Sequence, residues 1–418
     1  MCQADVVLSC SLEDLVRTFI ASKEQAILIL GSCSAAERDS WACNLVGLAE
    51  KNGIREIIPL AYSSRICHRV GKRSGIDLKS VYSEIYSSVF DASQNGNNGS
   101  SSGTEEDVVP LKKSPNYPPG TLFLLHEGHL VTNDYYETSP IFGSGFLLRD
   151  LLEYTAQVQD AKIAIVGDPY SLSFGDHKKS ALSEKTLQRL CPDVKIASYF
   201  APVPEHAGNA RMSFRLELCR SLDINLFNRL NLRSDGCSLA DLRENATASD
   251  LLTQWFSSPF RVEPDKAFLC YTRETCYKVN QWIRRKILGQ KEKIAPGDLL
   301  ISESNTYTRG EKDGEYDLLL NGSFYTVLKL LDARKENIPL KGMNGPVALS
   351  LTQVRVLCLS LDGVSQKDLW LYDSCLFDSK LPPGMEEAIK AYPHIRLSSL
   401  LKNEKFIDSL EFRFCRHS

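Results

Sequence analysis

The sequence predicts an α/β protein in which a doubly wound parallel sheet is followed by a smaller β module. Four short apolar runs stand at long intervals in the first half of the chain, and helical stretches lie between several of them. Because these runs do not alternate polar with apolar residues, they are typical of strands buried on both faces of a parallel sheet. The expected strands cover residues 26–30, 56–60, 121–125 and 162–166.

Two helices are expected around the first of these strands. Residues 11–21 place their apolar side chains on one face, and Ser11 is the expected N-terminal cap. Residues 35–53 form the second helix, which Gly53 is expected to end. The inward residues of this second helix are expected to be Trp41, Leu45 and Leu48.

The second half starts with another strand and helix and then changes character. We expect a strand over 267–271 and a helix over 274–288. Val279 and Trp282 fall on the apolar face of this helix, so packing in a core is expected for both. From Gly297 onwards, short β-like runs separated by turn residues predict a small barrel or SH3-like module. These runs cover 298–301, 316–320, 323–327, 354–361 and 368–372.

Length and composition limit the possible classes of function. The 418 residues are enough for two or three domains with buried cores. A net charge of −3 excludes a strongly basic chain, so any nucleic-acid binding has to come from a local surface. Residues 93–119 are rich in Asn, Gly and Ser, and a mobile insertion is expected there because such a segment lacks apolar side chains to pack.

The cysteines and the apolar runs indicate an intracellular protein. Thirteen cysteines are scattered without the C-x₂-C spacing of a zinc site, which is typical of a reduced compartment. No apolar run approaches the roughly 20 residues that span a bilayer, so no membrane attachment is expected. The sequence does not distinguish a cytoplasmic from a nuclear protein.

Gly31 follows the first strand and begins the layout of a phosphate-binding loop, in which a glycine and four residues lead into a helix. The motif then requires a second glycine, a lysine for the phosphates and a hydroxyl for Mg²⁺. At these positions the chain has Ala36, Glu37 and Arg38. Glu37 removes an attraction for phosphate, and the guanidinium of Arg38 has no lone pair to offer Mg²⁺. The loop is therefore predicted to keep its shape and to have lost its hold on ATP.

Two segments after this loop match an ordered pair of motifs. Residues 61–69 follow the second strand and are similar to the pattern A-P-T-G-R-A-A, of which Arg65 is kept. Residues 80–86 are similar to T-I-H-x-x-I-Y, of which Tyr86 is kept. The proline, the glycine and the histidine of these patterns are absent.

Two more segments stand at the ends of the third and fourth strands. Residues 125–130 occupy the place of a Walker B motif, with His126 instead of the aspartate and with the glutamate kept as Glu127. Residues 163–172 are similar to G-D-x-x-Q-L, with Ser171 instead of the glutamine. The kept residues of that pattern are Gly167, Asp168 and Leu172. In this order and spacing, the chain resembles a degenerate superfamily 1 helicase of the RecD/Pif1-like group.

This resemblance implies an organisation for the whole chain. It implies a P-loop NTPase, RecA-like domain over residues 1–195, followed over 196–292 by a helical connector and the start of a second RecA-like domain. It also implies an SH3-like β insertion with the C-terminal segment over 293–418. In the second half the resemblance rests on residues 269–284, 297–301 and 321–322.

The resemblance also implies roles for particular residues. Glu127 is the remnant of the catalytic glutamate that polarises the attacking water. The motif whose arginine touches the γ-phosphate has no clear counterpart, since Arg215 and Arg220 lie in its neighbourhood without the Arg-Gln context. The remnant of the nucleotide-binding site comprises Gly31, Arg38, Gly167 and Asp168. The nucleic-acid-binding candidates are Arg65, Arg69, Lys72, Thr272 and Arg284.

Structural interpretations of several of these residues stay open. Glu127 is also explained as a strand-end carboxylate held by local hydrogen bonds, and Asp168 as a marker of a tight turn. The basic residues within 68–73 fit either phosphate contact or a solvated helix end. No metal site is expected at His126 and His129, because this pair lacks helical spacing and a third ligand.

Two functions remain open from the sequence. In the first, the chain is a catalytically degenerate helicase-like protein, a non-hydrolysing scaffold that binds single-stranded DNA or RNA, or a protein, without a cofactor. In the second, it is a diverged or fragmentary ATP-dependent 5′→3′ DNA helicase with DNA-stimulated ATPase activity that uses ATP and Mg²⁺. The residues Glu37, Arg38 and His126 favour the first, because phosphoryl transfer depends on the groups that they replace. The chain is therefore predicted not to be an enzyme.

Overall fold

The chain, described by a computed structural model, divides into two compact units, Met1–Ala240 and Asp241–Ser418. Each unit has its own sheet and its own hydrophobic cores. The described residues are 12–31, 35–87, 108–113, 115–137, 141–200, 210–224, 250, 268–290, 293–302, 306–309, 316–340, 342–343, 345–360, 363–377, 381–389, 391–392 and 415–417.

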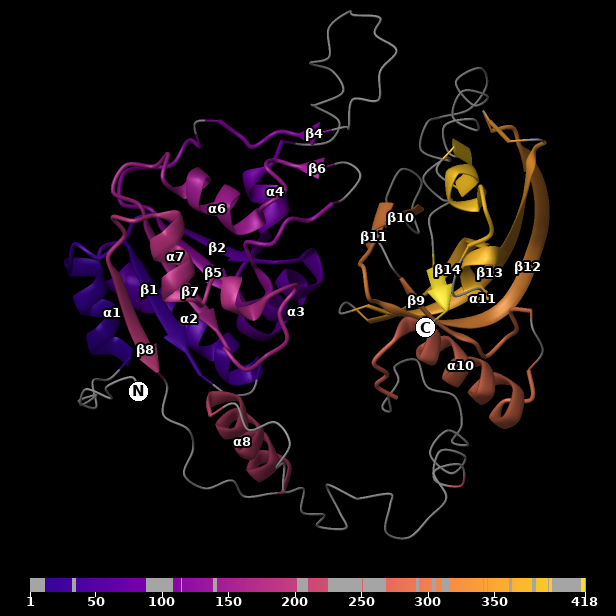
Figure 1. Ribbon diagram of the computed structural model, residues 1–418, viewed down its shortest axis with the longest axis horizontal. Helices are drawn as coiled ribbons and strands as arrows, with labels where there is room; N and C mark the ends of the chain where they lie inside the picture. Colours follow the sequence, from indigo (N-terminus) through magenta and orange to yellow (C-terminus); the bar gives the residue numbers. More distant parts are fainter. Residues whose placement is uncertain are drawn as a thin grey trace, which may run out of the picture. The chain divides into compact units, whose positions relative to one another are not determined.

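The first unit is built on a six-stranded sheet in which every neighbouring pair of strands is parallel. The strand order is β3-β2-β5-β7-β1-β8, so β7 lies between β1 and β5 (Figure 1). The strands are β1 (Ala26–Leu30), β2 (Ile57–Ala61), β3 (Lys79–Ser80), β5 (Leu122–His126), β7 (Lys162–Gly167) and β8 (Ile196–Phe200). Because all of them run the same way, the loops that follow β1, β5 and β7 meet at one edge of the sheet.

Helices cover both faces of this sheet. The helices predicted over 11–21 and 35–53 correspond to α1 and α2, and α3 begins at the cap Ser63 and ends at Gly75, whose φ is 75°. None of the helices among the described residues is long and apolar enough to cross a membrane. The helices of this unit are α1 (Leu12–Ala21), α2 (Ala35–Lys51), α3 (Ser64–Ser74), α4 (Val81–Ile85), α6 (Leu147–Thr155), α7 (Glu184–Leu190) and α8 (Ala210–Asp223), with 3₁₀ turns η1 (Gly128–Leu130) and η2 (His177–Lys179).

The four predicted strands are confirmed to within one residue at each end. All residues of β1 and β5 are buried, because helices pack on both faces of the sheet. Ala26, Leu28 and Leu30 enter a core with α4, α6 and α7. Ile27 and Ile29 enter a second core with α1 and α2. The α/β class with a parallel, RecA-like sheet is therefore confirmed.

The insertion predicted over 93–119 lies partly outside the described residues. Its described part contains β4 (Val108–Val109), which pairs in parallel with β6 (Ile141–Phe142). The backbone N–H of Lys112 donates to the carbonyl of Ile85 at 2.8 Å. The end of this segment is thus held against α4.

The second unit contains a five-stranded antiparallel sheet in the order β14-β13-β12-β9-β15. The small barrel or SH3-like module predicted from Gly297 onwards is confirmed as a β module, which is an antiparallel sheet. Its strands are longer than expected because β12 and β13 stay paired through two register shifts. The strands are β9 (Leu299–Ser302), β12 (Phe324–Ile338), β13 (Val347–Ser360), β14 (Gly363–Tyr372) and β15 (Cys415–His417), with a separate hairpin of β10 (Thr306–Arg309) and β11 (Tyr316–Leu319). The helical elements are α10 (Arg273–Trp282), the π-helical turn η3 (Ile283–Ile287) and α11 (Asp373–Phe377).

The strand predicted over 267–271 is wrong for the described residues 268–271, which form no strand. Leu269 is 92% exposed and Tyr271 is fully exposed, so no neighbouring strand buries them. A short apolar run alone does not distinguish a buried strand from an exposed segment that precedes a helix. The helix predicted over 274–288 is confirmed by α10 and η3.

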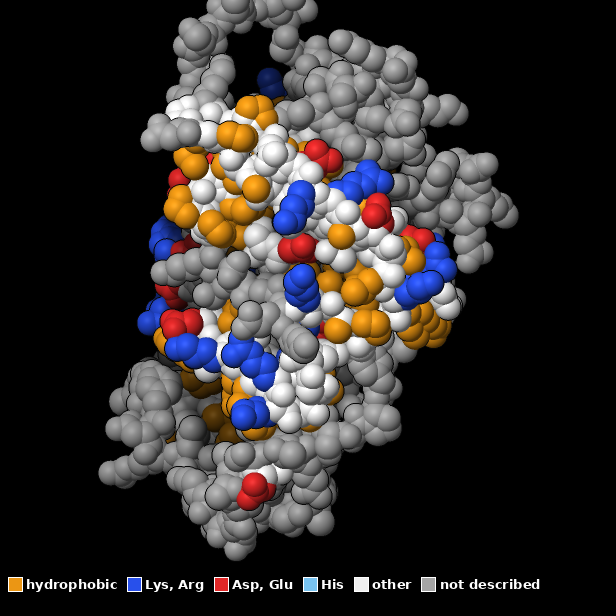
Figure 2. Space-filling view, turned by 90° about the vertical axis from the view of Figure 1, so that its right-hand side faces the viewer, with side chains coloured by type: hydrophobic (Ala, Val, Ile, Leu, Met, Phe, Trp, Pro, Cys, Tyr) orange, Lys and Arg blue, Asp and Glu red, His pale blue; other side chains and the backbone are white. Residues whose placement is uncertain are grey.

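One stretch of β12 is exposed to solvent on both faces of the strand. Every residue from 328 to 335 is exposed, and among the described strands only β13 pairs with β12 there, because β9 pairs with residues 324–326. Figure 2 looks from the side on which β12 lies in Figure 1 and shows hydrophobic side chains among Lys and Arg side chains. The exposed hydrophobic residues of β12 are Leu328, Leu330 and Leu331.

Candidate functional site

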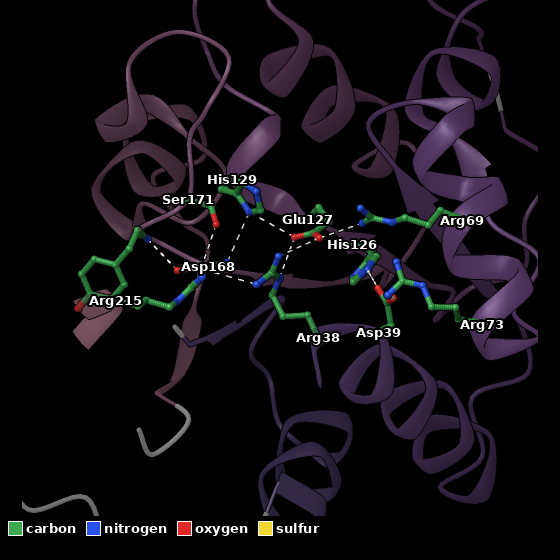
Figure 3. A network of polar contacts seen from close by, with 11 residues as sticks. Arg38, Asp39, Arg69, Arg73, His126, Glu127, His129, Asp168, Ser171 and Arg215 are labelled. Carbon is green, nitrogen blue, oxygen red and sulfur yellow. Dashed lines mark hydrogen bonds and ion pairs between the residues drawn. The ribbon is translucent and has the colours of Figure 1, made fainter. Parts of the chain in front are cut away.

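The functional candidates of the first unit meet at the carboxyl edge of the parallel sheet. Gly31 follows β1, Glu127 follows β5, and Asp168 follows β7. Arg38 lies in the first turn of α2 and points toward both carboxylates (Figure 3). Residues 32–34, between Gly31 and α2, lie outside the described residues. The sheet order brings these four candidates together at one edge.

Arg38 forms a buried, two-pronged ion pair with Glu127. Its Nε lies 2.8 Å from Glu127 Oε2, and its Nη2 lies 3.0 Å from Glu127 Oε1. Its third nitrogen, Nη1, lies 3.6 Å from Asp168 Oδ2. All three residues are at most 6% exposed. Two parallel charge-assisted hydrogen bonds are among the strongest polar contacts in proteins, so Arg38 is firmly held at the place where a P-loop has its hydroxyl.

Glu127 occupies a tight turn after β5. Its φ is 54°, a left-handed conformation that non-glycine residues rarely adopt. Gly128 follows, and a Cβ atom there would lie 2.4 Å from Ile165 Cγ2, so no larger residue fits. Burial raises the pKa of Glu127, but the hydrogen bonds and the charge of Arg38 outweigh burial and lower the pKa overall. Glu127 is therefore an ionised carboxylate that is committed to Arg38.

Asp168 is the second carboxylate that faces Arg38, and it is fully buried. The backbone N–H of Tyr170 and the hydroxyl of Ser171 donate to its side chain, each at 2.9 Å. Arg215, on α8, forms a further ion pair with it. Asp168 therefore fixes the turn after β7 and also joins the ion-pair network.

His126, which stands in place of the Walker B aspartate, is fully buried and has its own carboxylate partner. Its Nε2 donates to Asp39 Oδ1 at 2.7 Å, and Asp39 Oδ2 lies 3.1 Å from Arg73 Nη1. Burial raises the pKa of Asp39, but the hydrogen bond from His126 and the charge of Arg73 lower the pKa overall. Sequence reasoning missed Asp39, for which the only signal was its place next to Arg38 on α2.

Two further side chains approach Glu127 from other elements. Arg69 Nη2 lies 3.3 Å from Oε1, and His129 Nδ1 lies 3.5 Å from Oε2. His129 Nδ1 also accepts a hydrogen bond from the backbone N–H of Asp168 at 3.4 Å, and burial lowers the pKa of this imidazole. The network therefore sets four arginines against three carboxylates: Arg38, Arg69, Arg73 and Arg215 against Asp39, Glu127 and Asp168.

Helix α3 carries a continuous basic face. Its basic residues recur at spacings of three and four, which place them on one side of a helix, and its sequence contains no acidic residue. Arg69 and Arg73 bend inward to Glu127 and Asp39, so α3 is tied to the network by two of these side chains. The basic face of α3 comprises Arg65, His68, Arg69, Lys72 and Arg73.

The two candidates of the second unit occupy structural positions. The hydroxyl of Thr272 caps α10 by accepting a hydrogen bond from the backbone N–H of Thr275 at 3.1 Å. Arg284 is 2% exposed and holds both oxygens of Asp298 at 2.7 and 2.8 Å. A side chain as buried as that of Arg284 makes no contact with a ligand in solution.

The carboxylates at the edge of the first sheet are engaged by arginines. Mg²⁺ takes oxygen ligands in near-octahedral geometry, but both Glu127 and Asp168 are bound to arginine, and His126 replaces the aspartate. Within the described ranges, no group of three His, Cys, Asp or Glu side chains could hold a metal ion. Fold and site thus define an α/β domain with a parallel sheet, at one edge of which the charged side chains are paired with one another.

No protein-family model and no curated protein sequence matches the chain. Among solved structures, the Pif1 helicase from Candida albicans has 10% identity over 88% of this chain and 79% of that chain, with a TM-score of 0.34. Pif1 from Bacteroides sp in complex with ADP-AlF4 has 12% identity over 98% of this chain and 91% of that chain, with a TM-score of 0.31. At such low scores the fold assignment rests on the strand order and the burial of the sheet, not on these two likenesses.

Proposed function

We propose that this chain is a helicase-like protein that binds single-stranded nucleic acid and does not hydrolyse ATP. The observation that carries the loss of hydrolysis is the buried pair of Arg38 and Glu127, which occupies the two positions that a P-loop enzyme uses for Mg²⁺ and for water activation.

Opening this pair for a nucleotide is costly. Breaking a buried ion pair and leaving one charge without its partner costs about 3–5 kcal/mol. Because Arg69 stays beside Glu127, the lower end of this range applies. Since each 1.4 kcal/mol is a factor of ten in affinity, ATP binding is weakened by about two orders of magnitude if Arg38 has to leave Glu127. We therefore propose that the protein works without ATP and without Mg²⁺.

The basic face of α3 supports a nucleic acid as the partner. Phosphate contacts supply most of the sequence-independent affinity for nucleic acids, and lysine and arginine make these contacts. Arg65 and Lys72 are exposed on this face, and α3 contains no acidic residue that would repel a polyanion. A protein partner is the alternative outcome of the binding experiment described next.

A diverged ATP-dependent 5′→3′ DNA helicase is the second candidate. Glu127, Gly167 and Asp168 are kept, and Arg38 places a cation at the start of α2, where phosphates bind in P-loop proteins. This function requires Arg38 to move from the carboxylates to the phosphates when ATP binds.

The test is equilibrium binding of a fluorescent ATP analogue to the full chain with Mg²⁺, with and without single-stranded DNA, together with a phosphate-release assay. We expect no saturable nucleotide binding in the micromolar range and no phosphate release. The same preparation is titrated with a labelled oligo-dT strand, and we expect binding that weakens as salt is added. Oligonucleotide binding also shows that the preparation is folded and active.

Micromolar nucleotide binding that disappears in Arg38→Ala would overturn the proposal and support the helicase. Arg55→Ala is the matched control, because Arg55 is exposed and precedes β2 at the opposite edge of the sheet. If neither nucleotide nor oligonucleotide binds, the nucleic-acid part of the proposal is wrong and a protein partner takes its place.

A further inference from the structure

One loop of the first unit exposes large apolar side chains. Residues 168–176 follow β7, and within them Leu172 is 91% exposed and Phe174 is 47% exposed. A leucine and a phenylalanine at the tip of one loop leave apolar area in water, which costs free energy until a ligand covers them.

The backbone of this loop is fixed at both ends. At its start, Asp168 accepts hydrogen bonds from Tyr170 and Ser171. At its end, the carbonyl of Phe174 accepts from Thr132 Oγ1 at 2.7 Å and from the hydroxyl of Tyr136 at 2.5 Å. The hydrogen bonds at both ends of the loop therefore fix the position from which its apolar side chains extend.

The ring of Phe174 lies close to the N-terminus of α3, which carries the basic face. It stacks on the ring of Tyr62, with ring centroids 4.7 Å apart and planes 22° from parallel. Tyr62 precedes Ser63, which caps the N-terminus of α3. The aromatic stack thus stands next to the N-terminus of α3, whose basic face exposes Arg65, His68 and Lys72.

Arg38 connects the two parts of this surface through two carboxylates. On one side, Asp168 binds Arg38 and also Ser171 of the loop. On the other side, Glu127 binds Arg38 and also Arg69 of α3. Side chains of the protein therefore tie both parts to Arg38 (Figure 3).

We propose that the stack of Tyr62 and Phe174 binds the bases and the basic face of α3 binds the phosphates of one single strand, and that Arg38 holds these parts in place without a nucleotide. The inference rests on the proposed function, and it adds where the strand binds and why its binding is independent of ATP. Aromatic faces stack on any base, and arginine and lysine follow the phosphates, so the combination suits a single strand of any sequence. In this scheme Arg38 is a positioning residue, because it touches the carboxylates and not the strand.

The first experiment measures the anisotropy of fluorescein-labelled oligo-dT with the full chain at several salt concentrations. Phe174→Ala is expected to weaken binding by about fivefold or more, because one stacked base is lost, and Phe174→Tyr is expected to retain it. Arg65→Gln is expected to reduce the slope of log affinity against log salt by about 0.7, as one phosphate contact on a single strand requires. Arg55→Gln, which removes an exposed charge at the other edge of the sheet, is expected to change neither quantity.

The second experiment tests the role of Arg38. Mg²⁺-ATP is expected to leave the oligo-dT affinity of the wild-type chain unchanged. Arg38→Lys keeps the charge but cannot hold two carboxylates, so we expect weaker binding with an unchanged salt slope and faster deuterium exchange in residues 168–176. If Arg38→Lys does not fold, Ser171→Ala cuts the tie between the loop and Asp168 while Arg38 stays in place, and the same pattern is expected.

The outcomes separate this inference from the proposed function. Oligo-dT binding that is unaffected by Phe174→Ala or that changes with Mg²⁺-ATP would overturn the inference, while a chain without ATP hydrolysis still satisfies the proposed function. No oligo-dT binding by the wild-type chain would overturn the inference together with the nucleic-acid part of the proposed function. Phosphate release from ATP would overturn only the claim that hydrolysis is lost, provided that oligo-dT binding stays independent of ATP.

Discussion

Each unit of this chain has a buried arginine that holds a carboxylate with two hydrogen bonds, but the surroundings of the two pairs differ. In the first unit, Arg38 and Glu127 are 89 residues apart and belong to a network with further carboxylates and arginines. In the second unit, Arg284 and Asp298 are 14 residues apart and connect the start of η3 to the residue before β9.

The difference shows how to interpret a buried ion pair. The Arg284–Asp298 pair contacts the carbonyl of Lys293 and the N–H of Ala295, which lie within the same short segment. Such a pair stabilises a local connection. In the Arg38–Glu127 pair, Glu127 also contacts Arg69 of α3, and the side chain of Arg69 is 39% exposed to solvent. A buried ion pair that contacts partly exposed side chains is able to affect binding at the surface.

The largest expected effect comes from removing the two arginines. Arg284→Ala removes the two hydrogen bonds and the charge that Arg284 supplies to the buried Asp298, and we expect a loss of about 3–5 kcal/mol in the free energy of unfolding of the second unit. Arg38→Ala is expected to cost less, because Arg69 still faces Glu127 and other cations still face Asp168. Urea unfolding measures both losses, and deuterium exchange of peptides assigns each loss to a unit. An equal or larger loss for Arg38→Ala would contradict the comparison.

Paired apolar replacements sharpen the same comparison. Well-packed apolar side chains often replace an isolated buried ion pair without loss, so Arg284→Met with Asp298→Leu is expected to recover most of the stability. Arg38→Met with Glu127→Leu is expected to recover little, because Asp168 and Arg69 then lose a partner. Equal recovery in the two double variants would show that the pair in the first unit is also isolated.

A smaller effect is expected from pH, and in the first unit it begins at His129. Burial lowers the pKa of His129 below the value of about 6.5 that it has in an unfolded chain. The unfolded chain therefore binds this proton first, so stability is complete above about pH 6.5 and decreases as the pH drops below it. The pKa values of Glu127 and Asp39 are also lowered, so their contribution is present above about pH 4 and is lost as the pH falls further.

Urea midpoints at about pH 7.5 and about pH 5.5 test this dependence. We expect the wild-type first unit to be less stable at the lower pH, and His129→Gln to remove part of that difference. His177→Gln is the matched control, because His177 is exposed on η2 and is expected to leave the difference unchanged. If His129→Gln retains the whole difference, the proton is taken up elsewhere.

The sequence is sufficient to predict the sheet and the order of its motifs, but not which site residues form ion pairs with one another. Strand β1 and the first four residues of β5 are unbroken apolar runs because both faces of the sheet are covered, so the sequence alone predicts their burial. The motif order then placed Gly31, Glu127 and Asp168 at one edge.

The partner of Arg38 depends instead on strand order and on side-chain reach, which a motif does not contain. Glu37, Arg38 and His126 were interpreted as three separate losses from a nucleotide site. In the structure, Arg38 neutralises Glu127 and Asp168, and His126 is bound to Asp39. Two of the three replacements are therefore parts of one alternative arrangement of charges.

The smallest expected effect concerns Thr272, which the sequence suggested as a contact for nucleic acid and which the structure places at the N-terminus of α10. Thr272→Ala removes the hydrogen bond to the N–H of Thr275, and loss of such a cap costs about 1 kcal/mol. Thr272→Ser keeps the hydroxyl and is expected to restore the stability. If Thr272 only caps the helix, oligo-dT affinity stays the same in both variants, because the proposed strand-binding surface belongs to the first unit. An affinity that falls in Thr272→Ala and is not restored in Thr272→Ser would instead place part of the binding surface on the second unit.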